Sequence, residues 1–240
     1  MPVKPKPKTS WLTLLILAAA MALWWLDHIP PRVGTPHPPA AQTIPTRQKP
    51  PEKSNTPHPT AAAPSQEGNY EVYHGCQLVE NHSNDGDSFL VRLPGGRQEI
   101  LRLYYVDTPE SQFRRYKDGQ TNHERIRQQA AEMGGITPEQ AVEIGKQAKM
   151  FTLTLLETSP FTIYTCWDSP FHDQRYHAFV EVIVEGKPRW LHELLIEKGI
   201  ARIKTKPAPL PDGTTISIHQ THLRQLQSTA RAQARGVWKF

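Results

Sequence analysis

Proline is concentrated in one part of this chain, which limits where a folded domain can lie. Eleven of the 23 prolines fall between Pro30 and Pro64. Proline fixes φ and lacks a backbone N–H, so a stretch this rich in proline stays extended, partly as polyproline II. Residues 28–68 are therefore predicted to be a disordered tether, and residues 69–240 to form the folded domain.

An apolar run precedes the tether. Residues 11–26, from Trp11 to Leu26, are apolar at every position but one and follow three lysines. As a helix they would span about 24 Å, which is short of a hydrocarbon core of about 30 Å but workable with tryptophan at the interface. Residues 1–27 are thus predicted to be an export signal, and we favour a retained membrane anchor over a cleavable signal peptide. The lysines would keep the N-terminus in the cytoplasm and place the folded domain outside, or cleavage would leave it secreted.

The net charge of +5 is unevenly distributed. Residues 1–66 hold seven of the 28 basic and two of the 23 acidic side chains, so residues 67–240 hold 21 of each. Overall basicity therefore does not indicate that the folded part binds nucleic acid. Any attraction must come from the local placement of charge.

The folded part contains a clear hairpin pattern. Two apolar runs, residues 88–93 and 100–106, flank the turn sequence Pro94-Gly95-Gly96. Such a pattern predicts two antiparallel strands joined by a tight turn. A hairpin places the start of its first strand beside the end of its second.

Acidic residues lie at those two ends. Asp85 and Asp87 precede the first strand, and Asp107 and Glu110 follow the second. Converging carboxylates repel one another unless a proton or a cation lies between them, and oxygen ligands of this kind suit Ca²⁺ or Mg²⁺. Arg102 lies on the second strand, where a guanidinium could engage a phosphate near that cation. These groups together suggest phosphodiester hydrolysis.

The sequence Asp-Gly-Asp-Ser, followed by Leu-Arg-Leu-Tyr-Tyr-Val-Asp-Thr-Pro-Glu, resembles the thermonuclease, or staphylococcal-nuclease-like, family. The resemblance covers roughly residues 77–239 and is loosest at Ser88, where the family usually has threonine. It implies that one Ca²⁺ is bound by the side chains of Asp87 and Asp107 and by the carbonyl of Thr108. It also implies that Glu110 holds or deprotonates the attacking water.

The resemblance implies two phosphate-binding arginines. One is Arg102, and the other is Arg175, which directly precedes a predicted strand at residues 176–184. Bidentate donors that tighten on the extra negative charge of a pentacovalent phosphorane lower the barrier to its formation. Arg102, Glu110 and Arg175 are therefore the expected catalytic residues.

The remaining patterns, together with the resemblance, predict an α+β fold: a five-stranded OB-fold barrel with three helices. Thr137 and Pro138 form a good helix start, and Gly199 and Gly236 are typical helix stops. The expected strands are residues 70–79, 88–93, 100–106, 161–167 and 176–184, and the expected helices are residues 137–157, 190–198 and 219–235.

Two segments leave alternatives open. Residues 113–135 are polar and charged, which predicts either an exposed loop with a partial helix or a basic flap that guides a nucleic-acid strand toward Glu110. After the second helix the family prototype has tyrosines that hold the terminal nucleotide. This chain has Arg202, Lys204 and Lys206 there, either as charge contacts to substrate or as a solvated strand edge.

Two further pairs of residues have a possible chemical role. His192-Glu193 begins like the zinc-peptidase motif His-Glu-x-x-His, but Ile196 in the fifth position rules that motif out. In the implied barrel the first and fourth strands are antiparallel neighbours, so Cys76 and Cys166 could face each other. An exported domain makes an intramolecular disulfide plausible, and the alternative is two small buried residues.

The sequence therefore predicts an exported, membrane-tethered, monomeric nuclease. It would use Ca²⁺ to hydrolyse phosphodiesters in DNA and also RNA, and it would leave 3′-phosphate products. One alternative is a catalytically silent OB-fold module that binds nucleic acid or another partner at the cell envelope. A second is a structural envelope protein in which the proline-rich tether is the functional part.

Overall fold

The computed structural model describes residues 64–240. The predicted anchor and nearly all of the predicted tether lie outside these residues. Within the described part of the chain, no helix is both long and apolar enough to cross a membrane.

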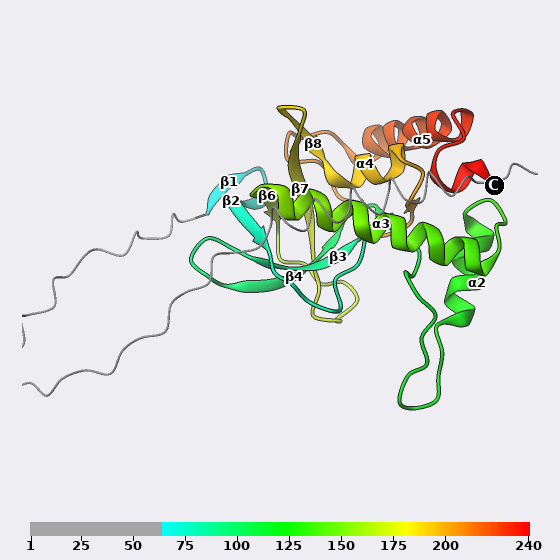
Figure 1. Ribbon diagram of the computed structural model, residues 1–240. Coiled ribbons are helices and arrows are strands. Elements are labelled where there is room, and N and C mark those ends of the chain that lie inside the picture. The colour runs from blue at the N-terminus through cyan, green and yellow to red at the C-terminus, as the bar shows by residue number, and fades with distance from the viewer. Residues whose placement is uncertain (1–63) are drawn as a thin grey trace, which may run out of the picture. The chain divides into compact units, whose positions relative to one another are not determined.

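Five strands close into a barrel (Figure 1). β2 (Tyr70–Leu78) pairs with β3 (Ser88–Arg92), β3 with β4 (Gln98–Leu103), β4 with β7 (Tyr176–Val184) and β7 with β6 (Phe161–Thr165), and β6 pairs back to β2. The β4–β7 pairing is parallel, and the other four are antiparallel. The predicted five-stranded OB-fold barrel and the α+β class are confirmed.

The barrel is extended at two places, and a small ladder lies beside it. β1 (Ser65–Glu67) pairs with β2, and β8 (Lys187–Trp190) pairs with β7. β5 (Val106–Asp107) and β9 (Arg202–Ile203) form a separate two-stranded ladder.

Within residues 64–240, four α-helices accompany the barrel, one more than predicted. They are α2 (His123–Glu132), α3 (Pro138–Thr158), α4 (Leu191–Glu197) and α5 (Ile216–Ala232), and a short 3₁₀ helix, η1 (Gly236–Lys239), follows. α3 begins where the sequence predicts, because the Thr137 and Gln140 side chains each accept a hydrogen bond from the other's backbone N–H. Figure 1 shows α3 lying along the barrel and reaching past it to α2.

The second strand of the hairpin ends earlier than predicted. β3 and β4 pair from Ser88 opposite Arg102 to Arg92 opposite Gln98, as the hairpin pattern requires. The predicted strand at residues 100–106 was wrong in its last part, because β4 stops at Leu103 and Tyr105 has a φ of +66°. This left-handed conformation is uncommon outside glycine. It turns the chain so that Val106 and Asp107 pair with β9 instead.

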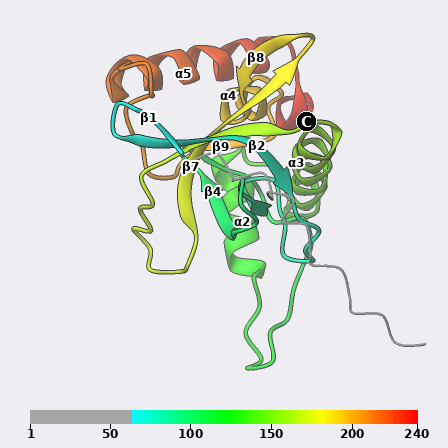
Figure 2. The ribbon, with the colours of Figure 1, turned by 90° about the vertical axis from the view of Figure 1, so that its left-hand side faces the viewer.

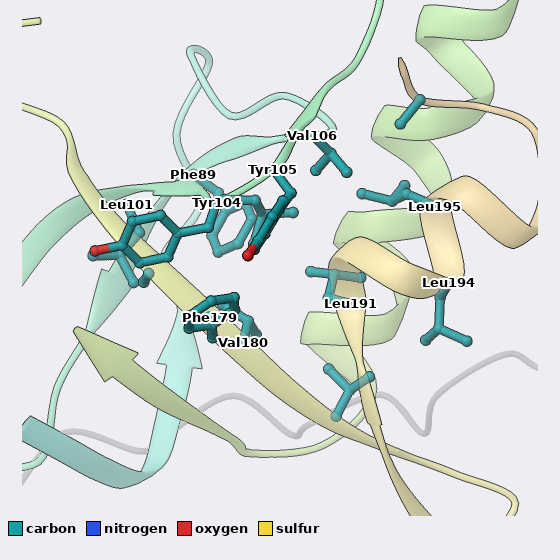
Figure 3. Packing of buried hydrophobic residues seen from close by; sticks show 14 of the residues in the cluster. Phe89, Leu101, Tyr104, Tyr105, Val106, Phe179, Val180, Leu191, Leu194 and Leu195 are labelled. Atoms are coloured by element: carbon teal, nitrogen blue, oxygen red, sulfur yellow. The ribbon is translucent and has the colours of Figure 1, made fainter. Parts of the chain in front are cut away.

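The core joins the barrel to α4. Figure 3 shows the side chains of Phe89, Tyr104, Tyr105 and Phe179 gathered opposite leucines of α4. The rings of Tyr104 and Phe179 lie 4.7 Å apart, centroid to centroid. The rings of Tyr104 and Tyr105 are both buried in this core, so the core fixes the bend from which the chain continues to Asp107.

The segment between the barrel and α3 projects from the molecule. Figures 1 and 2 both show the loop before α2 extending away from the barrel. A bridge between Arg115 and Thr121 holds its two arms together, and Phe113 and Tyr116 are exposed. An exposed loop with a partial helix is therefore what residues 113–135 form, while their action as a flap stays a prediction.

The predicted disulfide between Cys76 and Cys166 is wrong. The strands β2 and β6 are antiparallel neighbours as expected, but Cys76 pairs with Phe161 at one end of β6. Cys166 lies past the other end, about 16 Å further along at the usual rise per residue. Cys76 is buried, Cys166 is exposed, and both thiols are free.

Candidate active site

The two aspartates predicted to converge do so. Asp87 directly precedes β3, and Asp107 ends β5. The Asp87 Oδ2 atom accepts a hydrogen bond of 3.0 Å from the backbone N–H of Thr108, which directly follows Asp107. Arg102, from β4, places Nη2 2.9 Å from Asp107 Oδ1 and 3.8 Å from Asp87 Oδ2. All four residues are almost fully buried.

Helix α3 holds both acidic loops at close range. A Cβ on Gly145 would lie 2.4 Å from the carbonyl oxygen of Glu110, so only glycine allows the helix to approach this loop. Gly86, between the first two aspartates, has no room for a Cβ against Ala148 of the same helix. The Thr152 hydroxyl donates to the Gly86 carbonyl at 2.8 Å. The helix therefore fixes the separation of the two loops.

Helix α2 supplies polar groups that the sequence did not predict. Gln129 is fully buried, and its Nε2 donates to Asp107 Oδ2 at 3.2 Å and to the Thr108 carbonyl at 3.1 Å. Its Oε1 accepts a hydrogen bond of 3.0 Å from the backbone N–H of Glu110. One amide side chain thus connects three residues of the Asp107–Glu110 loop.

The Glu110 carboxylate faces α2 and is mostly shielded from solvent. Its Oε1 lies 3.0 Å from Arg125 Nε, and its Oε2 accepts a hydrogen bond of 3.3 Å from Asn122 Nδ2. Asn122 also bonds the Gln112 carbonyl and the Arg114 N–H at the base of the projecting loop. The orientation of Glu110 is therefore linked to that loop.

Three guanidinium groups meet at Asp107. Arg102 and Arg125 reach Oδ1, at 2.9 and 3.4 Å, while Arg202 reaches Oδ2 through Nε at 2.9 Å and Nη2 at 2.7 Å. Arg202 is placed by the register of β9, which sets it directly opposite Asp107. Its third nitrogen, Nη1, pairs with Glu132 of α2.

Arg175 and Arg102 line the same cleft. Arg175 directly precedes β7, pairs with Asp173, and donates from Nη1 to the Ser88 hydroxyl at 3.3 Å. Ser88 in turn donates to Asp87 at 3.0 Å. The cleft measures about 510 Å³, and its lining includes Arg102, Asp107, Arg125, Phe171, Arg175 and Arg202.

Burial and mutual repulsion disfavour ionisation of the first two aspartates. Burial, followed by the charge of Asp87, raises the pKa of Asp85 to about 6. Burial and the charge of Asp107 likewise raise the pKa of Asp87, although Arg102 opposes this. A cation beside these groups would favour their charged forms.

The donor set fits a calcium ion in its chemistry. Carboxylates and a backbone carbonyl are the hard oxygen ligands that Ca²⁺ takes, and Asp87, Asp107 and Thr108 present both kinds side by side. In this structure the oxygens of Asp107 are occupied by guanidinium and amide donors. An ion at Asp107 would therefore compete with Arg125 and Arg202.

Sequence reasoning missed four contributors: Asn122, Arg125, Gln129 and the pairing of Arg202 with Asp107. In α2, Ile126 and Ala130 share a buried face, but Gln129 between them interrupts the apolar pattern. Arg202 belongs to the charged run at residues 202–206, for which the sequence predicts either a substrate contact or a solvated strand edge. Its contact with Asp107 depends on the β5–β9 ladder. The strands of this ladder are only two residues long, which is too short to give a recognisable pattern in the sequence.

Comparison with protein families gives a match over the C-terminal part of the chain. Residues 100–240 match the model of the family described as staphylococcal nuclease homologue. The chain belongs to the staphylococcal nuclease family. The match includes Arg102, Asp107, Thr108, Glu110 and Arg175 but begins after Asp87. A comparison with curated proteins found no match.

Membership in this staphylococcal nuclease family agrees with the fold. The matched residues include three of the five barrel strands, β6, β7 and most of β4, together with all four α-helices. β2 and β3 both precede the matched residues, yet they complete the barrel. The chain is therefore a nuclease-like protein. Its site combines Asp87, which precedes the matched residues, with Arg102 and Asp107, which lie within them.

Proposed function

We propose that this chain is an exported, Ca²⁺-dependent nuclease that cleaves phosphodiester bonds in DNA and RNA and leaves 3′-phosphate products. The observation that carries the proposal is the cleft lined by Arg102, Asp107 and Arg175. Asp87 lies 3.8 Å from Arg102, and Glu110 pairs with Arg125, which also lines the cleft. The apolar and proline-rich N-terminal segments support a domain tethered to the outer face of a membrane or, after cleavage, secreted.

The arginines would bind the scissile phosphate from two directions. Arg102 comes from β4 at the floor of the cleft, and Arg175 comes from the loop before β7. Guanidinium donors hold phosphate oxygens in a fixed geometry and gain strength as negative charge develops on them. Both side chains would release their present carboxylate partners to do so.

Glu110 would orient the attacking water and accept its proton. Its carboxylate is held by Asn122 and Arg125, and Arg125 also lines the cleft that contains Arg102 and Arg175. In-line attack on phosphorus with departure of the 5′-oxygen leaves the phosphate on the 3′ side. A Ca²⁺ held by Asp87, Asp107 and the Thr108 carbonyl would supply positive charge beside the phosphate.

One observation favours the second candidate, a silent module that binds nucleic acid. Arg125 and Arg202 occupy the acidic groups that a cation would need, so the cleft is already neutralised without metal. A protein with this arrangement could hold a phosphate backbone through its arginines and never cut it.

Cleavage assays separate the two candidates. The purified chain would be incubated with single- and double-stranded DNA and RNA in Ca²⁺, Mg²⁺ or EDTA, beside an Arg102→Ala, Glu110→Ala double variant. The nuclease proposal requires cleavage in Ca²⁺ that EDTA and the double variant abolish, with 3′-phosphate ends on the products. Binding without cleavage in every metal would leave the silent module.

A further inference from the structure

A second cluster of possible metal ligands lies between α4 and α5, apart from the acidic cleft. His192, in the first turn of α4, and His219, in the first turn of α5, face each other with their Nε2 atoms 2.7 Å apart. Both rings are almost completely buried. Glu193, next to His192, points its Oε1 toward His219 Nδ1 at 3.8 Å.

The protein's own hydrogen bonds do not satisfy this cluster. One bond between the two Nε2 atoms uses one nitrogen of each ring, and His192 Nδ1 has no partner among the described residues. The contact between Glu193 and His219 is too long for a hydrogen bond. The Glu193 carboxylate therefore makes no hydrogen bond to either ring and is available as a ligand beside the two Nε2 atoms.

The protonation state of the rings suits a metal. Burial lowers the pKa of His219 to about 4 and holds the pKa of His192 well below its usual value, with the neighbouring histidines acting in the same direction. Both rings are therefore neutral at pH 7, which leaves a nitrogen lone pair on each. Neutral imidazole nitrogens and a carboxylate are the ligands that zinc takes in proteins.

We propose that His192, Glu193 and His219 bind a divalent transition-metal ion, with zinc the best match. One ligand atom from each of the three lies within 4.8 Å of the other two. Two nitrogens bound to one tetrahedral zinc at about 2.0–2.1 Å lie about 3.3 Å apart, so the rings would separate by about half an ångström. The histidine that the peptidase motif requires at position 196 is absent, and α5 supplies one from a distant part of the chain.

The cluster is bordered by His222 on its solvent side and by Tyr105 on its buried side. His222, one turn further along α5, is half exposed and lies 3.5 Å from Glu193 Oε1, at the solvent side of the cluster. On the other side Tyr105 stacks on His192 and packs edge-on against His219. An ion here would connect α4 to α5 beneath the bend that leads to Asp107.

Metal binding by the purified, chelator-treated full chain tests this site without using catalysis. Isothermal titration with Zn²⁺ is expected to show one site of micromolar or tighter affinity. Titration with Co²⁺ should give the visible absorption of a tetrahedral site. Zn²⁺ should raise the melting temperature where the same concentration of Ca²⁺ does not.

Variants locate the ion. His219→Gln should abolish the Zn²⁺ site, and Glu193→Gln, a milder change that keeps the shape of the side chain, should weaken it at least tenfold. Asp107→Asn, in the acidic cleft, should leave the Zn²⁺ affinity unchanged whether or not the chain is a nuclease. The proposal is overturned if the dissociation constant of wild type for Zn²⁺ exceeds about 0.1 mM, which corresponds to about 5 kcal/mol of binding free energy. It is also overturned if Glu193→Gln binds Zn²⁺ as tightly as wild type.

Discussion

Asp107 is the residue on which most of the cleft's charges converge. Four side chains contact its carboxylate: Arg102, Arg125, Gln129 and Arg202. The hairpin predicts its approach to Asp87, because pairing Ser88 with Arg102 leaves the two aspartates beside each other. The contacts of Arg125 and Gln129 come from α2 and that of Arg202 from β9, and no local pattern in the sequence connects either element to Asp107.

Arg125 is the partner most easily removed. Its side chain is half exposed, so replacing it should change stability by less than about 1 kcal/mol. The change Arg125→Gln removes a positive charge that competes with a cation at Asp107 and Glu110. We expect Ca²⁺ affinity to rise about fivefold, equivalent to about 1 kcal/mol of repulsion, when measured by calorimetry.

Arg127→Gln is the matched control for this change. It lies on the same helix but pairs with Glu124 alone, away from the cleft, and should leave Ca²⁺ affinity unaltered. Equal affinities in all three proteins would show that Arg125 does not compete with the ion.

Asp85 predicts a pH-dependent stability effect. Its pKa is raised to about 6 in the folded chain, so its ionisation opposes folding. Stability from this group is present below its unfolded pKa of about 4 and is lost as pH rises to about 6. The change Asp85→Asn should therefore stabilise the metal-free protein by up to about 3 kcal/mol at pH 7 and by little at pH 4.

Urea unfolding of both proteins in EDTA at the two pH values measures this difference. Asn keeps an oxygen for the Gly86 N–H that Asp85 accepts at 3.0 Å. A gain of the same size at pH 4 and pH 7 would contradict the ionisation argument.

Helix α3 was well predicted, and the reason is local. Thr137, Pro138 and Gln140 carry the helix start in their own chemistry, and the structure has the complete capping box. The end of β4 was not predicted, because Leu103, Tyr104, Tyr105 and Val106 continue an apolar run without a glycine. The bend at Tyr105 depends on distant partners, among them backbone hydrogen bonds with Lys204 and Lys206.

The close approach of α3 to the Glu110 loop makes Gly145 critical. In an open helix Gly145→Ala would add up to about 1 kcal/mol of stability. Here the new Cβ would overlap the Pro109 and Glu110 carbonyl oxygens, so the helix or the loop must shift. We expect a loss of about 1–3 kcal/mol and a cleavage rate about 100-fold lower, because a shift near 1 Å misplaces Glu110.

Lys146→Ala, at the next and exposed position of α3, should leave both quantities near wild type. The measurements are urea unfolding and cleavage rate under saturating substrate. A more stable Gly145→Ala protein with an unchanged rate would mean that the helix does not position the loop.

Across the whole domain, the sequence predicted the barrel but not every relation between its strands. Alternating apolar runs and the family resemblance gave the five strands and their closure. They did not give the register of β2 on β6, where the pairing is irregular between Tyr73 and Cys76. That register places Cys76 and Cys166 at opposite ends of the pair.

Free thiols follow from this register. In the absence of reductant, the folded chain should show one reactive thiol, Cys166, and the unfolded chain two, when titrated with a disulfide reagent. Reductant should not change the melting temperature. A single disulfide and no titratable thiol in denaturant would contradict the observed register.

We propose that Glu110 activates water beside a cleft that binds phosphate through its arginines. Glu110→Gln preserves the size of the side chain and its contact with Asn122 while removing the charge and the basic oxygen. The most direct measurement is the single-turnover cleavage rate of wild type and Glu110→Gln in saturating Ca²⁺, with DNA binding measured in parallel. We expect the variant to bind DNA within a few-fold of wild type and to cleave it at a rate lower by about 10²–10⁴. Equal cleavage rates in the two proteins would contradict the proposal.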